Sequence, residues 1–174
     1  DGTFNVQEML AQDTAAKNRL LQYAAGHMSE TQEFCWLAEP WDKTYLGFAD
    51  QALTGRLQPF MMARCLDARA ALAKLPVAES MSSGSVVVLL TDKMIERNNH
   101  LLQLRTSPGK LEAVSTLEQE EVTMDMGAFT QLYFGAFSAT ELWEAGRIKC
   151  SDVRKLQLLD ELFPKCRTYN NEYF

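Results

Sequence analysis

The sequence predicts an α+β fold, because the pattern of strands and helices changes twice along its 174 residues. Residues 1–56 alternate short strands with helices, which is typical of α/β units. From residue 57 the predicted strands are joined by turn residues, as in a largely antiparallel meander, and helices then fill the rest of the chain. We therefore expect a first segment of residues 1–56 and a separate domain of residues 57–174.

The first segment reads as strand, helix, strand and helix. Alternation of apolar and polar residues predicts a strand over residues 3–9, and Asp13 is placed to cap the helix that follows. A second strand over residues 33–37 ends before Pro40, and apolar spacing predicts a second helix over residues 42–53. Two strands and two helices make too small a core to be stable alone, so we expect this segment to belong to a larger domain.

The domain that follows begins with a strand and a helix. We expect the strand over residues 60–66 and the helix over residues 68–75, with Asp67 as its cap and Pro76 as its end. Alternating or valine-rich runs then predict the strands of one sheet, at residues 85–91, 100–106, 110–116 and 121–124.

Polar residues and glycines mark the ends of the helices that follow the sheet. Asp125 is placed to cap a helix over residues 126–134, which Gly135 ends. The same signals mark the remaining boundaries: a capping box at Ser138 and Glu141, a glycine stop at Gly146, and a last helix that starts at Ser151 or Asp152.

Composition and charge argue against several classes of function. The net charge is −6, from 17 basic and 23 acidic residues without a basic stripe, so nucleic acid is not an expected partner. No run approaches the roughly 20 apolar residues of a membrane helix. The sequence also shows no secretory signal at its start, and we expect no membrane partner. The four cysteines lack CxxC spacing and the two histidines lie far apart, which predicts reduced thiols, a cytoplasmic protein and no metal site.

The end of the chain is aromatic, with Tyr173 and Phe174 where a polar, frayed terminus is usual. We expect such an end to be docked, with its α-carboxylate held beside an apolar ring. A carboxylate fixed in this way is either a general base or a structural anchor, and chemistry alone favours the anchor.

Four features occur in a fixed order along the chain. They are the motif M-x-R-x-x-D-x-x-x-A-L from Met62 to Leu72, the motif Q-L-x-x-G from Gln131 to Gly135, the run Ala145-Gly146-Arg147, and the terminal Phe174. Together they resemble the C-terminal part of the enhanced intracellular survival (Eis) type of GNAT acetyltransferases.

Members of that family carry two GNAT-like modules followed by a domain with a sterol-carrier-protein-2-like fold. The resemblance implies that residues 57–174 form this last domain, a sheet with packed helices. Residues 1–56 then form the closing half of the second GNAT-like module.

The resemblance also implies an activity. It is the transfer of an acetyl group from acetyl-CoA to an amine, carried by an aminoglycoside-like small molecule or by a lysine side chain. The family uses its C-terminal carboxylate as general base, a role that carries over to Phe174 alone. Acetyl-CoA and the tyrosine that acts as general acid belong to a module outside this chain. We therefore expect no cofactor-binding residue, no metal and no activity from the chain alone, and we expect a homo-oligomer.

Two other functions stay open. A sterol-carrier-like fold indicates a possible tunnel for an apolar ligand, although helical spacing favours a packed helix. The residues that would line this tunnel are Phe129, Leu132, Tyr133, Phe134 and Phe137. A purely structural or oligomerisation module is the third interpretation.

Overall fold

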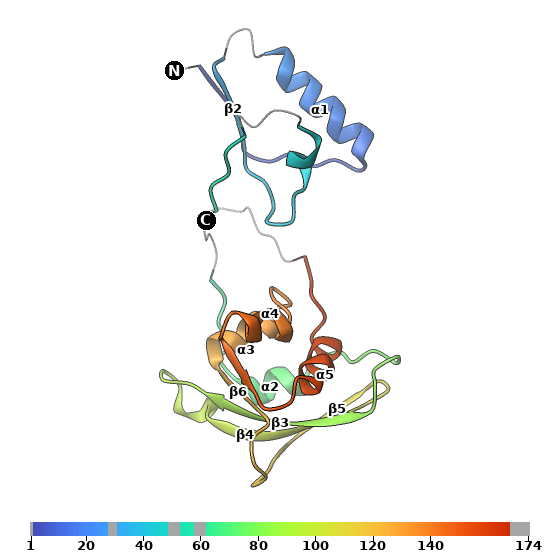
Figure 1. Cartoon of the computed structure of the whole chain (residues 1–174), viewed down its shortest axis with the longest axis vertical. Helices are drawn as coiled ribbons and strands as arrows, with labels where there is room; N and C mark the ends of the chain where they lie inside the picture. Colours follow the sequence, from blue (N-terminus) through green and yellow to red (C-terminus); the bar gives the residue numbers. More distant parts are fainter. Residues whose placement is uncertain (1, 28–30, 49–52, 58–61, 168–174) are drawn as a thin grey trace. The chain divides into compact units, whose positions relative to one another are not determined.

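The computed structural model describes residues 2–27, 31–48, 53–57 and 62–167 (Figure 1). The described residues up to 57 form one compact unit, here called unit 1, and residues 62–167 form a second, unit 2. Each unit is described by itself. No helix within the described ranges is long and apolar enough to cross a membrane.

Unit 1 is built on two parallel strands, β1 (Thr3–Val6) and β2 (Glu33–Trp36), which helix α1 (Thr14–Gly26) connects. The predicted cap is confirmed, because the Asp13 side chain accepts a hydrogen bond of 2.7 Å from the backbone N–H of Ala16. This bond satisfies one of the free N–H groups at the start of the helix.

The predicted helix over residues 42–53 is wrong in its described part. Only a 3₁₀ turn, η1 (Thr44–Gly47), forms there, and Phe48 is already extended. The Asp42 carboxylate accepts a hydrogen bond of 2.8 Å from the Thr44 N–H, and such a local bond competes with a regular helix. The remainder of the prediction includes residues 49–52, which lie outside the described ranges.

Unit 1 has almost no core of its own. Among its described residues Ala24 alone is buried, and two leucines on the apolar faces of the predicted helices are open to solvent. Leu20 is 41% exposed and Leu46 is 72% exposed. The expectation of a core too small to stand alone agrees with this exposure.

Unit 2 contains a five-stranded sheet in the order β5-β4-β3-β6-β7. Its strands are β3 (Gly84–Thr91), β4 (His100–Ser107), β5 (Lys110–Ser115), β6 (Val122–Asp125) and β7 (Ile148–Cys150). The first three form the predicted antiparallel meander, β6 joins β3 in parallel, and β7 pairs antiparallel with β6. Strand β7 was not predicted, because three residues after a helix stop carry too little pattern.

One face of the sheet carries the helices (Figure 1). They are α2 (Ala68–Ala73), α3 (Met126–Tyr133), α4 (Ala139–Glu144) and α5 (Arg154–Leu162). Val86, Val88 and Leu90 point from β3 into the core, where they join Phe129 and Leu159. Sheet and helices together confirm the predicted α+β fold class.

The boundaries of α2, α3 and α4 follow the predicted capping signals, whereas α5 begins at Arg154, after Val153, and not at Ser151 or Asp152 as predicted. The side chains of Asp67 and Asp125 each accept a backbone N–H at the start of α2 and α3, and Ser138 forms the full capping box with Glu141. Gly135 and Gly146 adopt φ values of +65° and +69°, the left-handed conformation that ends a helix.

Residues 62–66 do not form the strand predicted over residues 60–66; positions 60 and 61 lie outside the described ranges. The backbone of this segment bonds to side chains instead of a neighbouring strand. The Cys65 N–H donates to the Thr130 hydroxyl at 3.0 Å, and the Leu66 carbonyl accepts from the Asn98 amide at 3.2 Å.

Candidate functional site

Phe174, the residue predicted as general base, lies outside the described residues, which end at Arg167. The structure does describe the stretch that leads towards it. Residues 163–167, here called the exit segment, leave helix α5 and belong to no helix or strand. Its described contacts show how residues 163–167 are held.

The exit segment begins with a buried aromatic side chain. Phe163 is 2% exposed, and its ring meets that of Phe129 edge to face, with centroids 6.2 Å apart at 82°. Its N–H donates to the Leu159 carbonyl at 2.8 Å. Aromatic pairs in this geometry add stability beyond the area they bury, so the start of the exit segment is fixed to the core.

Two polar contacts hold the next residues of the exit segment. The Cys166 N–H donates a hydrogen bond of 2.9 Å to the carbonyl of Gly135, at the end of α3. The Lys165 ammonium lies 2.6 Å from a carboxylate oxygen of Glu141 on α4 and lowers the pKa of that carboxyl group. The second Glu141 oxygen accepts the Ser138 N–H at 2.9 Å, which completes the capping box.

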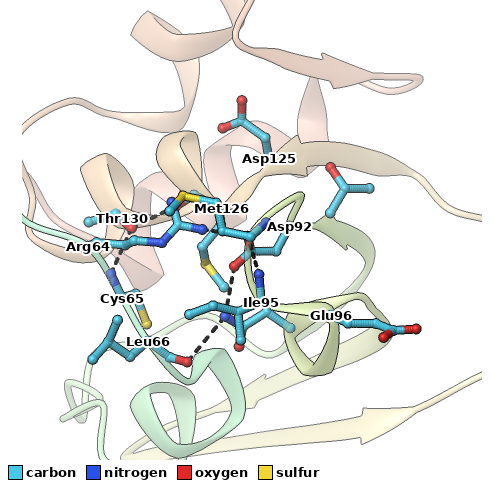
Figure 2. A network of polar contacts seen from close by, with 12 residues as sticks. Arg64, Cys65, Leu66, Asp92, Ile95, Glu96, Asp125, Met126 and Thr130 are labelled. Carbon is cyan, nitrogen blue, oxygen red and sulfur yellow. Dashed lines mark hydrogen bonds and ion pairs between the residues drawn. The ribbon is translucent and has the colours of Figure 1, made fainter.

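A second polar cluster fixes the segment at the start of unit 2 (Figure 2). The Asp92 carboxylate is fully buried and forms an ion pair with Arg64. It also accepts hydrogen bonds from the N–H groups of Met94 at 2.8 Å and Ile95 at 3.1 Å, and from the Asn98 amide at 2.9 Å. The bond from Asn98, with those from the backbone and the Arg64 charge, outweighs burial and lowers the pKa of Asp92 to about 2.

Asn98 links this cluster to helix α2. It is 1% exposed, and its side-chain oxygen accepts the Ala68 N–H at 3.2 Å. Its amide nitrogen donates to both Asp92 and the Leu66 carbonyl. No local sequence pattern indicates this link to α2, because Ala68 and Leu66 lie 30 and 32 positions away from Asn98.

Three residues of the motif from Met62 to Leu72 have structural roles in unit 2. Arg64 neutralises Asp92, Asp67 caps α2, and Leu72 is buried in the core. Met62 itself is exposed and contributes nothing to this core. A carboxylate that accepts four donors and has a pKa of about 2 is a poor proton acceptor at neutral pH, so Asp92 is not suited to act as a general base.

Unit 1 has an open groove of about 630 Å³ between helix α1 and residues 42–48. Its one acidic lining residue, Asp42, has a side chain that is 8% exposed and pairs with the Lys17 ammonium at 2.8 Å. Thr44 and the Trp36 indole also donate to it. Burial alone would raise the pKa of Asp42, but these donors together lower it well below its usual range. The groove therefore presents a satisfied carboxylate and not a reactive one.

The interior of unit 2 is filled by side chains. The space between the sheet and the helices amounts to about 10 Å³, no more than a single water needs. Phe129, Leu132 and Leu159 line it, and the Tyr133 hydroxyl donates to the Ala71 carbonyl at 3.3 Å. The packed-helix interpretation of these aromatic residues agrees with the structure, and the tunnel interpretation does not.

The described residues hold no evident metal centre. Within residues 2–27, 31–48, 53–57 and 62–167, no three His, Cys, Asp or Glu side chains gather closely enough to bind an ion.

Two family profiles match the chain. The profile of the sterol carrier protein domain covers residues 68–171, more than half of the chain. The profile of the GNAT acetyltransferase domain covers residues 1–65. Comparison with curated proteins gives no match.

Several solved structures have a similar fold. A GCN5-related N-acetyltransferase from Anabaena variabilis aligns with a TM-score of 0.75 at 18% identity, over 99% of this chain and 44% of its own. A conserved protein of unknown function from Enterococcus faecalis, described as a probable N-acyltransferase, aligns with a TM-score of 0.75 at 23% identity, over 94% and 42%. Eis1 from Mycobacterium abscessus gives 0.66 at 19% identity, over 99% and 44%. The chain thus spans less than half the length of these structures, and the likeness at such low identity shows the fold.

Proposed function

This chain belongs to the sterol carrier protein domain family, and from that premise we propose that it is the C-terminal region of an N-acetyltransferase. The observation that carries the proposal is the order of the two matched domains, with a GNAT acetyltransferase domain over residues 1–65 and the sterol carrier domain directly after it. Solved structures that align with 94–99% of this chain are described as an N-acetyltransferase and as a probable N-acyltransferase. We place the closing half of the GNAT-like module at residues 1–56 and the sterol-carrier-like domain at residues 57–174.

The finer proposal is an enzyme of the Eis type that moves an acetyl group from acetyl-CoA to an amine. The acceptor is an aminoglycoside-like small molecule or a lysine side chain, and acetyl-CoA is bound outside this chain. The amine gives its proton to a base, its nitrogen attacks the thioester carbonyl, and the bond from carbon to sulfur breaks. The thiolate of CoA then takes up a proton from a general acid.

We propose the C-terminal carboxylate of Phe174 as that base. An α-carboxyl group is ionised at neutral pH and becomes a better proton acceptor where an apolar ring removes water from it. Two carboxylates among the described residues whose side chains are at most 8% exposed support the choice indirectly. Asp92 and Asp42 are both saturated by donors and both have a lowered pKa, so neither is suited to accept a proton from an amine.

The test is the removal of Phe174 from the full-length enzyme. We expect kcat to fall roughly 10²-fold or more, the usual contribution of a positioned general base, while KM for acetyl-CoA stays the same. A second variant with one glycine added after Phe174 keeps the ring and moves the carboxylate, and it should lose activity to a similar degree. Normal kcat in both variants, measured by release of the CoA thiol, would refute the base.

The filled interior of unit 2 argues against the alternative function, a carrier of an apolar ligand.

We also expect the full-length enzyme to be a homo-oligomer. Light scattering after size-exclusion chromatography measures its molar mass and so tests this expectation directly.

A further inference from the structure

We propose that unit 2 carries both halves of a contact between copies of this chain. In this contact an acidic loop of one copy, residues 117–120, binds a basic and apolar surface of a second copy. That surface, here called the methionine patch, comprises Met62, Leu66, Lys93, Met94 and Arg97. The inference rests on the homo-oligomer proposed above and names the two surfaces that form it.

The methionine patch is brought together by the Arg64–Asp92 cluster (Figure 2). The ion pair between Arg64 and Asp92, and the hydrogen bond from Asn98 to the Leu66 carbonyl, hold residues 62–66 beside the turn of residues 92–98. Three apolar side chains stay at the surface of these two segments: Met62 is 99% exposed, Met94 78% and Leu66 60%. Apolar side chains gathered at one place mark an interaction surface more often than a single exposed one does, and methionine is enriched in interfaces.

The methionine patch also carries unpaired positive charge. Lys93 and Arg97 are both exposed, and neither forms an ion pair with any side chain in the described part of the chain. Of the two acidic residues in the turn, Asp92 is buried and neutralised by Arg64, so Glu96 alone offsets these cations. The turn is therefore positive at the surface, although the net charge of the chain is −6.

The acidic loop has the opposite charge and a similar apolar side chain. It connects β5 to β6 across β4 and β3, on the face of the sheet that carries no helices (Figure 1). Leu117 is fully exposed, and Glu118 and Glu120 follow it at the surface. Glu118 accepts a hydrogen bond of 3.3 Å from the Gln103 amide on β4, which supports the loop from the sheet.

The two surfaces complement each other. The methionine patch requires a partner with an apolar side chain beside carboxylates, and the acidic loop of this chain has that composition. Complementary charges steer two surfaces together and fix their register, while flexible methionine side chains adapt to the leucine between them. A contact between two different surfaces leaves no surface unused when the copies close into a two-fold pair or a ring. A second copy is thus the occupant that the charges favour.

Reversal of the charges tests the contact in the full-length enzyme. One variant combines Glu118→Lys with Glu120→Lys, and the other combines Lys93→Glu with Arg97→Glu. We expect the dissociation constant of the oligomer to rise at least tenfold in each, because like charges then face each other across the contact. All four substitutions in one chain restore opposite charges and should restore the oligomer. Sedimentation velocity measures the molar mass over a range of concentrations.

Two single reversals at exposed positions outside both surfaces serve as controls. They are Glu144→Lys and Lys149→Glu, which should leave the molar mass of the wild type unchanged. Since all the reversed side chains are exposed, the thermal midpoint should stay the same within about 2 °C, in accord with the small effect of most surface substitutions.

The apolar half of the contact is tested by mixing two variants. Leu117→Asp removes the apolar side chain of the acidic loop, and Met94→Asp places a carboxylate in the methionine patch. A buried leucine contributes a factor of roughly 10 to 100 to a binding constant, so neither variant should associate with itself at micromolar concentration. In an equimolar mixture one intact loop meets one intact patch, and we expect a complex with one copy of each.

The outcomes separate this inference from the proposals above. A monomeric wild type refutes the homo-oligomer and the contact together. An oligomeric wild type whose variants all keep its mass refutes the contact alone, and so does an oligomer that is lost without rescue by the fourfold reversal or by mixing. Removal of Phe174 tests the general base through kcat and not through these masses, so the base and the contact fail independently.

Discussion

The side-chain amide of Asn98 donates a hydrogen bond of 2.9 Å to the buried carboxylate of Asp92. The two residues lie six positions apart, in the turn between β3 and β4, and Asn98 also holds Leu66 and Ala68. One amide thus joins a charged site in a turn to the start of the first helix of unit 2. Because every polar atom of the Asn98 side chain is used, its removal has several consequences at once.

The first prediction concerns the stability of this link. Asn98→Ala leaves the buried Ala68 N–H without its partner and removes one donor from the buried Asp92 carboxylate. Each unsatisfied buried group costs about 1–3 kcal/mol. We expect the free energy of unfolding to fall by roughly 2–4 kcal/mol, measured by urea denaturation. Gln103→Ala, on the solvent side of β4, is the control and should change it by less than about 0.5 kcal/mol. Equal values for the two variants would contradict the role of Asn98.

The second prediction concerns the pH dependence of stability. The pKa of Asp92 falls from 3.8 to about 2 in the folded protein, so folding favours the ionised form. The stabilisation is complete above the pKa of the unfolded chain and is lost as pH falls through the folded pKa. We expect the free energy of unfolding to drop between about pH 4 and pH 2, and this drop to be smaller in Asp92→Asn. Parallel pH curves for the two proteins would show that Asp92 is not the source.

Local signals in the sequence predicted the parts of the fold that depend on neighbours. Asp13, Asp67 and Asp125 cap helices because the capped N–H lies three positions later, and that distance is visible in any sequence. The same holds for Gly135 and Gly146, whose stop signals follow directly on helical patterns.

The wrong strand over residues 60–66 depends on partners far along the chain, whereas the lost helix after Asp42 reflects a local bond to Thr44. The apolar run at residues 62–66 looks like a strand, but its hydrogen bonds go to Asn98 and Thr130, 32 and 65 positions away. No local pattern reveals such partners. The candidate site shows the same limit, since Phe174 came from a family resemblance while the contact between Gly135 and Cys166 became visible only in the structure.

The third prediction concerns the packed interior of unit 2. Leu132 is fully buried and borders the small space of about 10 Å³ between sheet and helices. We expect Leu132→Ala to lower the free energy of unfolding by about 2–5 kcal/mol, the usual cost of a cavity left by a leucine. The wild-type protein should bind no fluorescent fatty acid in a one-to-one complex. Tight, stoichiometric binding would restore the carrier interpretation.

The fourth prediction concerns the four thiols, none of which is paired in a disulfide. Cys65 and Cys150 have a raised pKa, caused chiefly by burial, so at neutral pH they hold little of the reactive thiolate. Cys35 and Cys166 are exposed. We expect an aromatic disulfide reagent to modify Cys35 and Cys166 rapidly, and Cys65 and Cys150 only on unfolding. Peptide mass spectrometry assigns the modified sites.

A Cys35→Ser variant should then show one fast thiol, Cys166, whose rate of modification measures how accessible the exit segment is. Rapid reaction of Cys65 in the folded protein would contradict its placement beside Thr130 in the core, because the N–H of Cys65 is bonded there at 3.0 Å.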